Sequence, residues 1–521
     1  MKPNADAHST HGQFSEENIG NTPIQDGQLG GSVPHSAQTD STTSLGEKQP
    51  DVREKEEEGN VKEAPGAKIG ASSSTSINEE VDIEKRSSRL SSSDGKGAAD
   101  GGSQPPDTSD LSMDPEGNVY PEGGLQANLV VFGSFIALFG TLGLVNSVAI
   151  FVAWVSTHQL KEYSDGSIAW IFGIYAFLMF FCGVQIGPVF DAKGPRFLVL
   201  AGSILVVVSI ILFGFCTQYW HFMVAWGVVG GIGMSLIFTP AIASPGHFFY
   251  KFRGAATGVA STGGSLGGVV FPLMLQELFP KIGWAWGTRV IALIVLISAG
   301  VGCLLIKSRL PKKKATKENI LPDARIFRDP LFTLTTMGIF FTEWGLFIPI
   351  TYISSYALSQ GMSEKLSYQV IAILNVGSCF GRWIPGFTAD YIGRFNTMIL
   401  TVALCLLSIA CLWLPAGDSV AMLVVFALVF GFASGSNIGL TPVCVGQVCK
   451  TEHYGRYYAT AYTVVSFGTL TGVPIAGAIL TSNGGHYWGL ITFTICCYFA
   501  GLVCFISAKV VRHGWNPLSI Y

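Results

Sequence analysis

The sequence predicts an all-α polytopic membrane protein that is preceded by a long polar tail. Only 13% of its 521 residues are charged and 49% are hydrophobic, whereas soluble domains carry roughly a quarter charged residues. Twelve apolar segments follow Pro121, each of about 20 residues and therefore long enough to cross a hydrocarbon core. Several short motifs also recur between the two halves of this apolar region.

The tail differs from the rest of the chain in charge and in composition. Up to Gly124 the chain contains 10 Lys and Arg against 23 Asp and Glu, and the remainder contains 22 basic and 12 acidic residues. The tail is rich in Ser and Gly and lacks apolar periodicity, so it cannot bury enough surface to offset the entropy of ordering. We therefore expect residues 1–120 to form a disordered acidic tail in the cytoplasm.

The apolar segments are predicted to be helices, because lipid offers backbone groups no other hydrogen-bond partners. Six lie in an N-terminal half at 121–307 and six in a C-terminal half at 331–511, with a basic central loop at 308–330 and a short tail at 512–521. The predicted spans are 128–153, 167–190, 196–216, 221–243, 254–279, 284–307, 331–356, 366–388, 396–415, 418–445, 456–481 and 487–511.

Basic residues are concentrated on alternate connections between these spans. One set of connections carries only Lys161, Lys281 and Lys365. The other set carries Lys193, Arg196, Lys251, Arg253, the cluster at 307–328, Arg394, Lys450, Arg456, Lys509 and Arg512. Because basic loops stay in the cytoplasm, both termini and the central loop are expected there. The plasma membrane is the expected location, although composition does not distinguish it from the vacuole.

The two halves repeat the same landmarks. Residues 187–196 read GPVFDAKGPR and residues 386–394 read GFTADYIGR, so that Gly, Asp and Gly recur at the same spacing. The dipeptide Thr-Pro recurs at 239–240 and 441–442, and Pro272 has a counterpart in Pro474. These coincidences predict two parallel six-helix repeats that are related by an axis along the membrane normal.

The repeated motifs also carry a family resemblance. Residues 386–394 resemble the loop signature of the major facilitator superfamily, and 187–196 are a variant of it. Residues 121–124 lie just before the first span. They resemble the motif found at the entry to the first helix in the monocarboxylate transporter family. Residues 187–196, 253–258 and 381–386 resemble the fungal branch of that family. The resemblance covers about 121 to 511 and implies a major facilitator fold and a substrate among small carboxylates, riboflavin or secondary metabolites.

The sequence departs from the animal carriers of that family at two positions. Proton-coupled animal monocarboxylate carriers have a lysine at about the level of Asn146. They also have an aspartate one turn before the arginine that corresponds to Arg382, where this chain has Ser378. The resemblance therefore supports lactate–proton symport less well than transport of a larger or less charged substrate.

Charged residues at the repeated loops are candidates for gating. Asp191 and Arg196 lie in the first copy, and Asp390 and Arg394 in the second. A carboxylate near a helix start and a neighbouring cation can pin two helices together. The resemblance implies that such a contact breaks when the cytoplasmic side opens, whereas a permanent loop contact is the alternative.

The segment 254–268 is rich in glycine and could be mistaken for a nucleotide-binding loop. Neither a preceding strand nor a following Lys-Ser/Thr pair is present, so that interpretation is rejected. Small residues in lipid allow helix backbones to approach closely, and this is the role that we expect for the segment.

Two charged residues inside the spans are the main candidates for substrate and proton binding. A charge near the bilayer centre costs about 3 kcal/mol unless it is paired or hydrated. The presence of Glu343 and Arg382 inside the spans therefore indicates a functional or structural role. Glu343 could exchange protons, because burial favours the neutral carboxyl group. Arg382 could hold a carboxylate with two hydrogen bonds. The alternatives are a static hydrogen bond between helices for Glu343 and a structural partner of the Asp390 loop for Arg382.

Uncharged amides on other spans are further candidates. Asn146, Asn375 and Asn437 suit the recognition of neutral or mixed substrates, but amides also join helices to one another.

These features predict a secondary transporter that moves a small organic metabolite by alternating access, with proton coupling expected. Covalent catalysis, a cofactor, a metal site and nucleic-acid binding are not expected. The alternatives are efflux of a fungal secondary metabolite, uptake of a riboflavin-type vitamin, a channel-like facilitator without proton coupling, and a nutrient sensor that signals through the tail.

Overall fold

The computed structural model describes residues 112–113, 117–311 and 324–514. Most of the predicted disordered tail and residues 312–323 of the central loop lie outside this range. Within the range that we expected to be disordered, two short strands form, β1 (Ser112–Met113) and β2 (Val119–Tyr120). They pair antiparallel, with Ser112 opposite Tyr120. The ordered chain thus begins earlier than its composition indicates, because tertiary contacts described below hold it.

The N-terminal half is a sequence of helices that begins directly after the paired strands. Its elements are α2 (Gly124–Asn146), α3 (Val148–Thr157), α4 (Asp165–Phe181), α5 (Gly183–Lys193), α6 (Arg196–Phe213), α7 (Tyr219–Phe222), the π-helix η2 (Met223–Gly230), α8 (Gly231–Ala243), the 3-10 helix η3 (Ser244–His247) and α9 (Arg253–Leu305).

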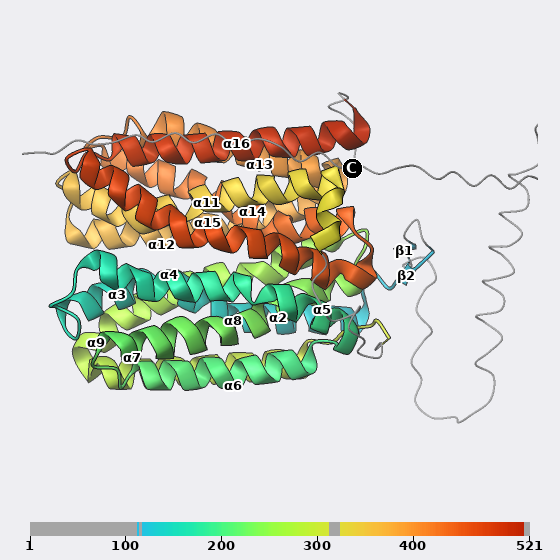
Figure 1. The fold of residues 1–521 in the computed structure, drawn as a ribbon, viewed down its shortest axis with the longest axis horizontal. Helices are drawn as coiled ribbons and strands as arrows, with labels where there is room; N and C mark the ends of the chain where they lie inside the picture. The colour runs from blue at the N-terminus through green and yellow to red at the C-terminus, as the bar shows by residue number, and fades with distance from the viewer. Residues whose placement is uncertain (1–111, 114–116, 312–323, 515–521) are drawn as a thin grey trace, which may run out of the picture. The chain divides into compact units, whose positions relative to one another are not determined.

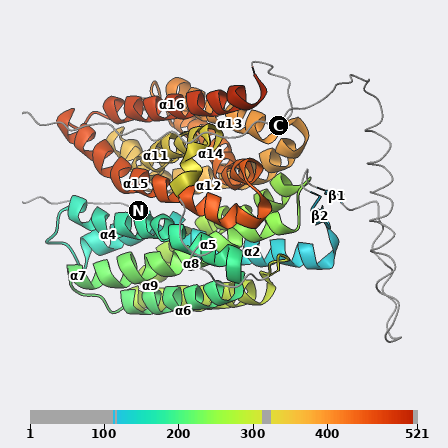
Figure 2. The ribbon, with the colours of Figure 1, turned by 45° about the vertical axis from the view of Figure 1, so that its right-hand side comes forward.

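The C-terminal half repeats this organisation. Its elements are the 3-10 helix η4 (Ala324–Arg328), α11 (Pro330–Ser359), α12 (Glu364–Ile392), α13 (Arg394–Ser408), the π-helix η5 (Ile409–Trp413), α14 (Val420–Val448), the 3-10 helix η6 (Thr451–His453), α15 (Tyr454–Ser482) and α16 (Trp488–His513). The helices of each half gather in one group (Figures 1 and 2).

The helices account for all twelve predicted spans. Within the described residues, eleven helices are long and apolar enough to cross a membrane. The longest, α9, reverses at Gly283, whose φ of 78° lies outside the helical region. Both arms of α9 pack on α2, because Gly133 lies against Leu305 and Gly263 lies against Phe135. The helix α9 therefore supplies two adjacent spans.

Side-chain caps and glycines mark many of the helix boundaries. Ser164, Asp329, Ser363 and Ser419 each accept a hydrogen bond from a backbone N–H group in the first turn of the helix that follows, as expected of N-cap residues. At the opposite end, Gly194 follows α5 with φ 81° and Gly393 follows α12 with φ 98°. Glycine adopts such left-handed conformations most easily, and this explains the last glycine of each repeated motif.

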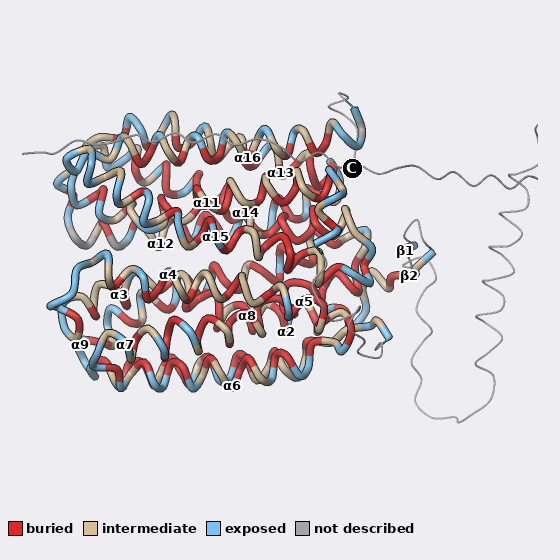
Figure 3. Tube along the Cα trace, viewed as in Figure 1, coloured by how far each residue is buried: buried red, intermediate tan, exposed pale blue. Residues whose placement is uncertain are grey.

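Apolar side chains cover both the interior and the outer surface of the helices. The interior holds large buried residues such as Trp226, Trp413 and Phe271, and the buried positions follow the inward faces of the helices (Figure 3). Outward residues such as Phe197 and Leu304 are exposed although they are apolar. An apolar outer surface is what contact with lipid tails requires.

Candidate functional site

The first repeated aspartate joins the N-terminal half to the C-terminal half. Asp191, near the end of α5, accepts hydrogen bonds from the backbone N–H groups of Gly455 and Arg456 at 2.9 and 2.8 Å. Both amides belong to the first turn of α15. A carboxylate in this position satisfies unpaired N–H groups and interacts favourably with the helix dipole. We call this contact the Asp191 latch.

The second repeated aspartate makes the same contact in the opposite direction. Asp390, near the end of α12, accepts hydrogen bonds from the N–H groups of Gly254 and Ala255 at 2.9 and 2.8 Å. These amides open α9 in the N-terminal half. We call this contact the Asp390 latch, and the end of the bundle that holds both latches, where α5 ends at the right of Figure 1, is the charged end.

Glycines allow the helices that carry the latches to touch through their backbones. A Cβ atom on Gly187 would overlap the carbonyl oxygen of Gly455, and one on Gly254 would overlap that of Gly386. Gly187 and Gly386 are the first residues of the two repeated motifs. The motifs therefore specify both the aspartate and the close approach that the aspartate needs.

Two arginines add further hydrogen bonds between the halves. Arg253 is fully buried and donates to the carbonyl oxygen of Gly446 at 2.8 Å and to the hydroxyl of Thr451 at 3.1 Å. Arg394 donates to the carbonyl oxygen of Tyr250. Because each arginine bonds to the opposite half, the charged end is held closed in this structure.

The structure places three of the four gating candidates at the boundary between the two halves. We call this boundary the seam. Asp191, Asp390 and Arg394 bond to the opposite half. Arg196, in contrast, has an exposed side chain at the first residue of α6. The sequence pointed to neighbouring cations as partners of the aspartates, and the structure provides helix N-termini.

The predicted proton and substrate candidates lie on neighbouring helices. Glu343, near the middle of α11, is only 4% exposed, and Arg382 of α12 is 3% exposed. The hydroxyl of Tyr462 on α15 is within hydrogen-bonding reach of the Glu343 carboxyl group, and Arg382 acts on the same group electrostatically. In the described part of the chain, the two charges are not joined by an ion pair within 4.0 Å.

Arg382 reaches the opposite half, and one of its buried nitrogens is not paired within the described residues. Its Nη1 donates to the carbonyl oxygen of Ser261 on α9 at 2.6 Å. Its Nε is buried and has no hydrogen-bond partner among the residues that the structure describes. An unsatisfied buried donor on a charged group is costly, so this atom is suited to a ligand that supplies an acceptor.

Two of the amide candidates, Asn146 and Asn375, lie close to one another beside Gly268. Asn146 donates to the carbonyl oxygen of Gly264 at 3.1 Å. A Cβ atom on Gly268 would lie 2.7 Å from the Oδ1 of Asn375 and 2.8 Å from the Nδ2 of Asn146. Asn375 belongs to the other half, so the two side chains approach one another across the seam. A cavity of about 20 Å³ beside Asn146 has room for about one water molecule.

Asn437 has a different environment. It is 3% exposed, accepts a hydrogen bond from Thr401 at 3.0 Å and donates to the sulfur of Cys405 at 3.5 Å. Both partners lie on α13 of the same half. The sequence left open whether this amide recognises substrate or joins helices, and its contacts correspond to the second role.

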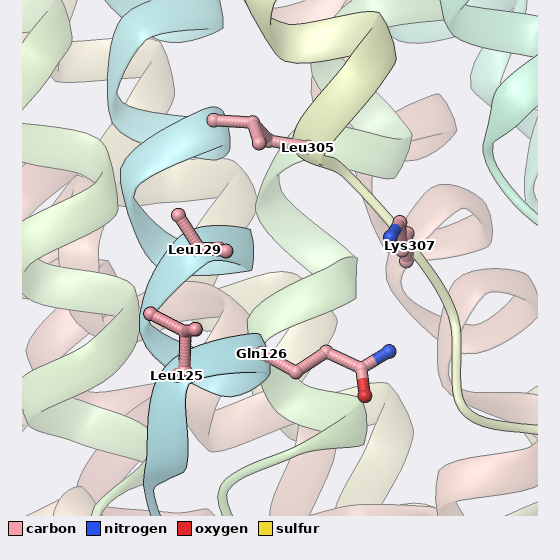
Figure 4. A pocket seen from close by; sticks show the side chains of 5 residues that line it. All are labelled: Leu125, Gln126, Leu129, Leu305 and Lys307. Atoms are coloured by element: carbon pink, nitrogen blue, oxygen red, sulfur yellow. The ribbon is translucent and has the colours of Figure 1, made fainter. Parts of the chain in front are cut away.

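A groove lies away from these residues. It has a volume of about 390 Å³ and lies between the start of α2 and the end of α9 (Figure 4). Its lining residues are Leu125, Gln126, Leu129, Leu305 and Lys307. Because none of the candidate residues lines it, this groove is separate from the candidate site.

Two residues that the sequence did not single out belong to the candidate site. Arg253 lies at a basic connection, where a cation indicates topology, and its burial against the other half was not visible in the sequence. Tyr462 is an ordinary aromatic residue within an apolar span. The resemblance of residues 253–258 to the fungal branch of the monocarboxylate transporter family is a signal that could have identified Arg253.

Taken together, two six-helix halves joined by matched latches form an architecture that is typical of secondary transporters. The sequence model of the Major Facilitator Superfamily matches residues 130–446 and 386–518. This chain belongs to the Major Facilitator Superfamily.

Individual relatives agree with this assignment. The chain is similar to the riboflavin transporter MCH5 of Saccharomyces cerevisiae, with 35% identity over 76% of this chain and 80% of the relative. It is also similar to the aspyridones efflux protein apdF of Emericella nidulans, with 35% identity over 76% and 80% of the two chains. A crystal structure of the human organic anion transporter MFSD10 shares the fold, with a TM-score of 0.58 and 15% identity over 73% of this chain and all of that chain. The protein is accordingly a multi-pass membrane transporter and not an enzyme.

Proposed function

We propose that this chain is a proton-linked secondary transporter for a small organic acid and that it works by alternating access. Arg382 binds the anionic group of the substrate and Glu343 exchanges the proton. The unpartnered Nε of Arg382, buried at the seam between the halves, is the observation that carries this proposal. A carboxylate would satisfy that donor, and substrate binding would then compete with the bond between Arg382 and Ser261.

The position of Glu343 supports the proton-linked part of the proposal. Its carboxyl group is almost inaccessible to solvent, lies close to Tyr462 and is influenced by the charge of Arg382. When a substrate carboxylate neutralises Arg382, Glu343 loses the favourable effect of that cation. A proton on Glu343 then restores the charge balance, so anion and proton bind together.

The substrate remains within the range that the sequence indicated. Resemblance to the monocarboxylate family favours a small carboxylate, and the names of two relatives favour a riboflavin-type vitamin or an exported secondary metabolite. The amides Asn146 and Asn375 suit the polar part of such larger molecules. We propose the plasma membrane as the location, with both termini in the cytoplasm.

Uptake into liposomes tests the substrate class. The purified protein is reconstituted, an inward-acid pH gradient is imposed, and initial uptake of labelled pyruvate and labelled riboflavin is measured side by side. Pyruvate uptake that follows the gradient supports the proposal. Uptake of riboflavin alone, or of neither compound, would move the search to larger metabolites.

The substitution Glu343→Gln tests the proton step. We expect transport to lose its dependence on the pH gradient while exchange of labelled for unlabelled substrate continues, because exchange needs no net proton movement. Glu277→Gln is the matched control, since Glu277 is 71% exposed and pairs with Lys281 at 2.6 Å on the same helix. A Glu343→Gln protein whose transport still follows the gradient would favour the channel-like facilitator or another proton site.

A nutrient sensor with the same fold is the alternative of another class. Deletion of residues 1–111 separates the two functions. A sensor would lose its cellular response and keep binding, whereas a transporter keeps its transport rate.

A further inference from the structure

The residues just before the first span contact both halves of the protein at the charged end. We call residues 117–123 the N-terminal strap; it contains β2 and leads directly into α2. Its principal contacts use the side chains of Tyr120 and Glu122. Neither residue belongs to the repeated motifs, and neither is needed for the substrate and proton chemistry proposed above.

Glu122 binds the backbone of the connection that leads into α9. Its carboxylate accepts hydrogen bonds from three consecutive backbone N–H groups, those of Tyr250 and Lys251 at 2.7 Å and that of Phe252 at 3.0 Å. The backbone of Glu122 has φ 46°, a left-handed conformation that is uncommon outside glycine. Its own N–H donates to the carbonyl oxygen of Phe248 at 3.2 Å. The strained conformation is thus offset by a set of charge-assisted hydrogen bonds.

The segment that Glu122 holds is one side of the seam between the halves. The carbonyl oxygen of Tyr250 accepts from Arg394 of the C-terminal half. Arg253, next to the segment, bonds to Gly446 and Thr451 of the same half. The amides of the Asp390 latch follow immediately at the start of α9. Glu122 therefore fixes the position of the whole group that closes the charged end from the N-terminal side.

Tyr120 crosses the seam itself. It is 1% exposed, and its hydroxyl group donates to the hydroxyl of Thr451 in the C-terminal half at 2.6 Å. Its ring lies 5.3 Å from the ring of Tyr250, and the guanidinium of Arg309 lies over it at 5.1 Å. The hydrogen bond between Tyr120 and Thr451 must therefore break if Thr451 moves away with the C-terminal half.

We propose that the N-terminal strap is part of the gate. Tyr120 and Glu122 hold the charged end closed, and Thr451 must leave Tyr120 before the halves can separate there. These two residues position the gate and do not touch the substrate.

Backbone hydrogen exchange, measured by mass spectrometry, tests this role on the purified full chain. The readout is the exchange rate of the amides of Gly455 and Arg456, which the Asp191 latch protects and Glu122 does not contact. Tyr120→Phe keeps the ring and removes one inter-half hydrogen bond, so we expect these amides to exchange about fivefold faster. We expect Glu122→Gln to have an effect in the same direction.

Tyr219→Phe is the matched control. It also removes one tyrosine hydrogen bond, from the hydroxyl of Tyr219 to the carbonyl oxygen of Ser167 at 3.0 Å, but both residues lie in the N-terminal half. Exchange at Gly455 and Arg456 should not change in this variant. Faster exchange confined to residues 248–252 in the Glu122→Gln protein, with the Asp191 latch unaffected, would show a local structural role and overturn the proposal.

The measurement needs neither a substrate nor a proton gradient, so its outcome is independent of the proposed function. Melting temperatures of the variants identify any protein that has failed to fold. A second pair of variants, Thr451→Val alone and together with Tyr120→Phe, checks that the effect acts through this hydrogen bond. The double variant should exchange no faster than the faster single variant, whereas additive effects would contradict the assigned contact.

Discussion

At the scale of single residues, the site depends on polar groups that have an incomplete set of partners. Arg382 bonds to Ser261 through one nitrogen, and its buried Nε has no partner in the part of the chain that the structure describes. Asp191 and Asp390, in contrast, each accept two backbone hydrogen bonds. The aspartates hold the two halves together in this structure, and we propose that the arginine binds a ligand.

The substitution Arg382→Lys tests the anion site. Lysine keeps the charge but lacks the planar fork of donors, so we expect the KM for an anionic substrate to rise about tenfold, equivalent to about 1.4 kcal/mol. Initial uptake rates over a range of substrate concentrations measure this change. Arg289→Lys is the control, because Arg289 lies just after the reversal of α9 at Gly283, with its guanidinium 4.7 Å from the ring centroid of Trp286. An unchanged KM in the Arg382→Lys protein would place the substrate anion elsewhere.

The substitution Asp390→Asn tests the second latch. The amide keeps one acceptor and loses the charge, so we expect the closed charged end to lose about 1–2 kcal/mol. Hydrogen exchange at the distant Asp191 latch should then accelerate roughly tenfold, because the halves separate as units. Asp418→Asn, at an exposed carboxylate in the connection before α14, should leave exchange unchanged. Acceleration at Gly254 and Ala255 alone would indicate a permanent loop contact and not a gate.

At the scale of helices, two pairs of elements bring backbones of the two halves close together. The helix α5 packs on α15 and the helix α9 packs on α12, in each case through glycines that bring backbones together. Beyond the latches, the α9 and α12 pair continues to Ser265 and Ser378, whose hydroxyl groups lie 2.9 Å apart. Small residues allow helices to separate and approach again without interlocked side chains.

The substitution Gly187→Ala tests this packing. The added methyl group would overlap the carbonyl oxygen of Gly455, so the closed charged end should be destabilised and hydrogen exchange at Gly254 and Ala255 should accelerate. Gly300→Ala is the control, because nothing lies within 4 Å of a Cβ atom there. If Gly187→Ala alters exchange only around Gly455, the helices adjust locally and the halves are not coupled as rigid units.

At the scale of the whole molecule, the repeat relates the two latches to one another. Each half contributes an aspartate and receives one at the start of a helix. Two matched contacts at one end of the seam resist separation of the halves there and leave the other end less constrained. Alternating access requires this kind of asymmetry between the two ends.

The number of spans and the distribution of basic residues predict the position of the termini. Twelve crossings place both termini on the same side, and the basic connections place that side in the cytoplasm. A tag at either terminus should bind antibody only after the cells are permeabilised. A tag within 158–164, the connection after α3, should bind antibody on intact cells. Binding of both terminal tags on intact cells would reverse the proposed orientation.

Much of the fold was predictable because the membrane imposes strong rules on the sequence. Span length, apolar composition and the absence of alternative backbone partners predicted each crossing. The repeat predicted that Asp191 and Asp390 have equivalent roles. The burial of Arg253 and the ordered strap around Tyr120 were not predictable, because both depend on residues more than 100 positions away in the chain.

The sequence by itself determined the class of the protein, the twelve spans, the repeat and the residues with unusual charge, because these follow from local composition and periodicity. The tertiary structure decided which of these residues meet. It assigned the aspartates to helix N-termini of the opposite half, turned Asn437 toward α13, exposed Arg196 and brought Tyr120 into contact with Thr451 of the C-terminal half. Such pairings depend on which helix faces contact one another in three dimensions. The hydrophobic pattern of a single helix does not determine its partner.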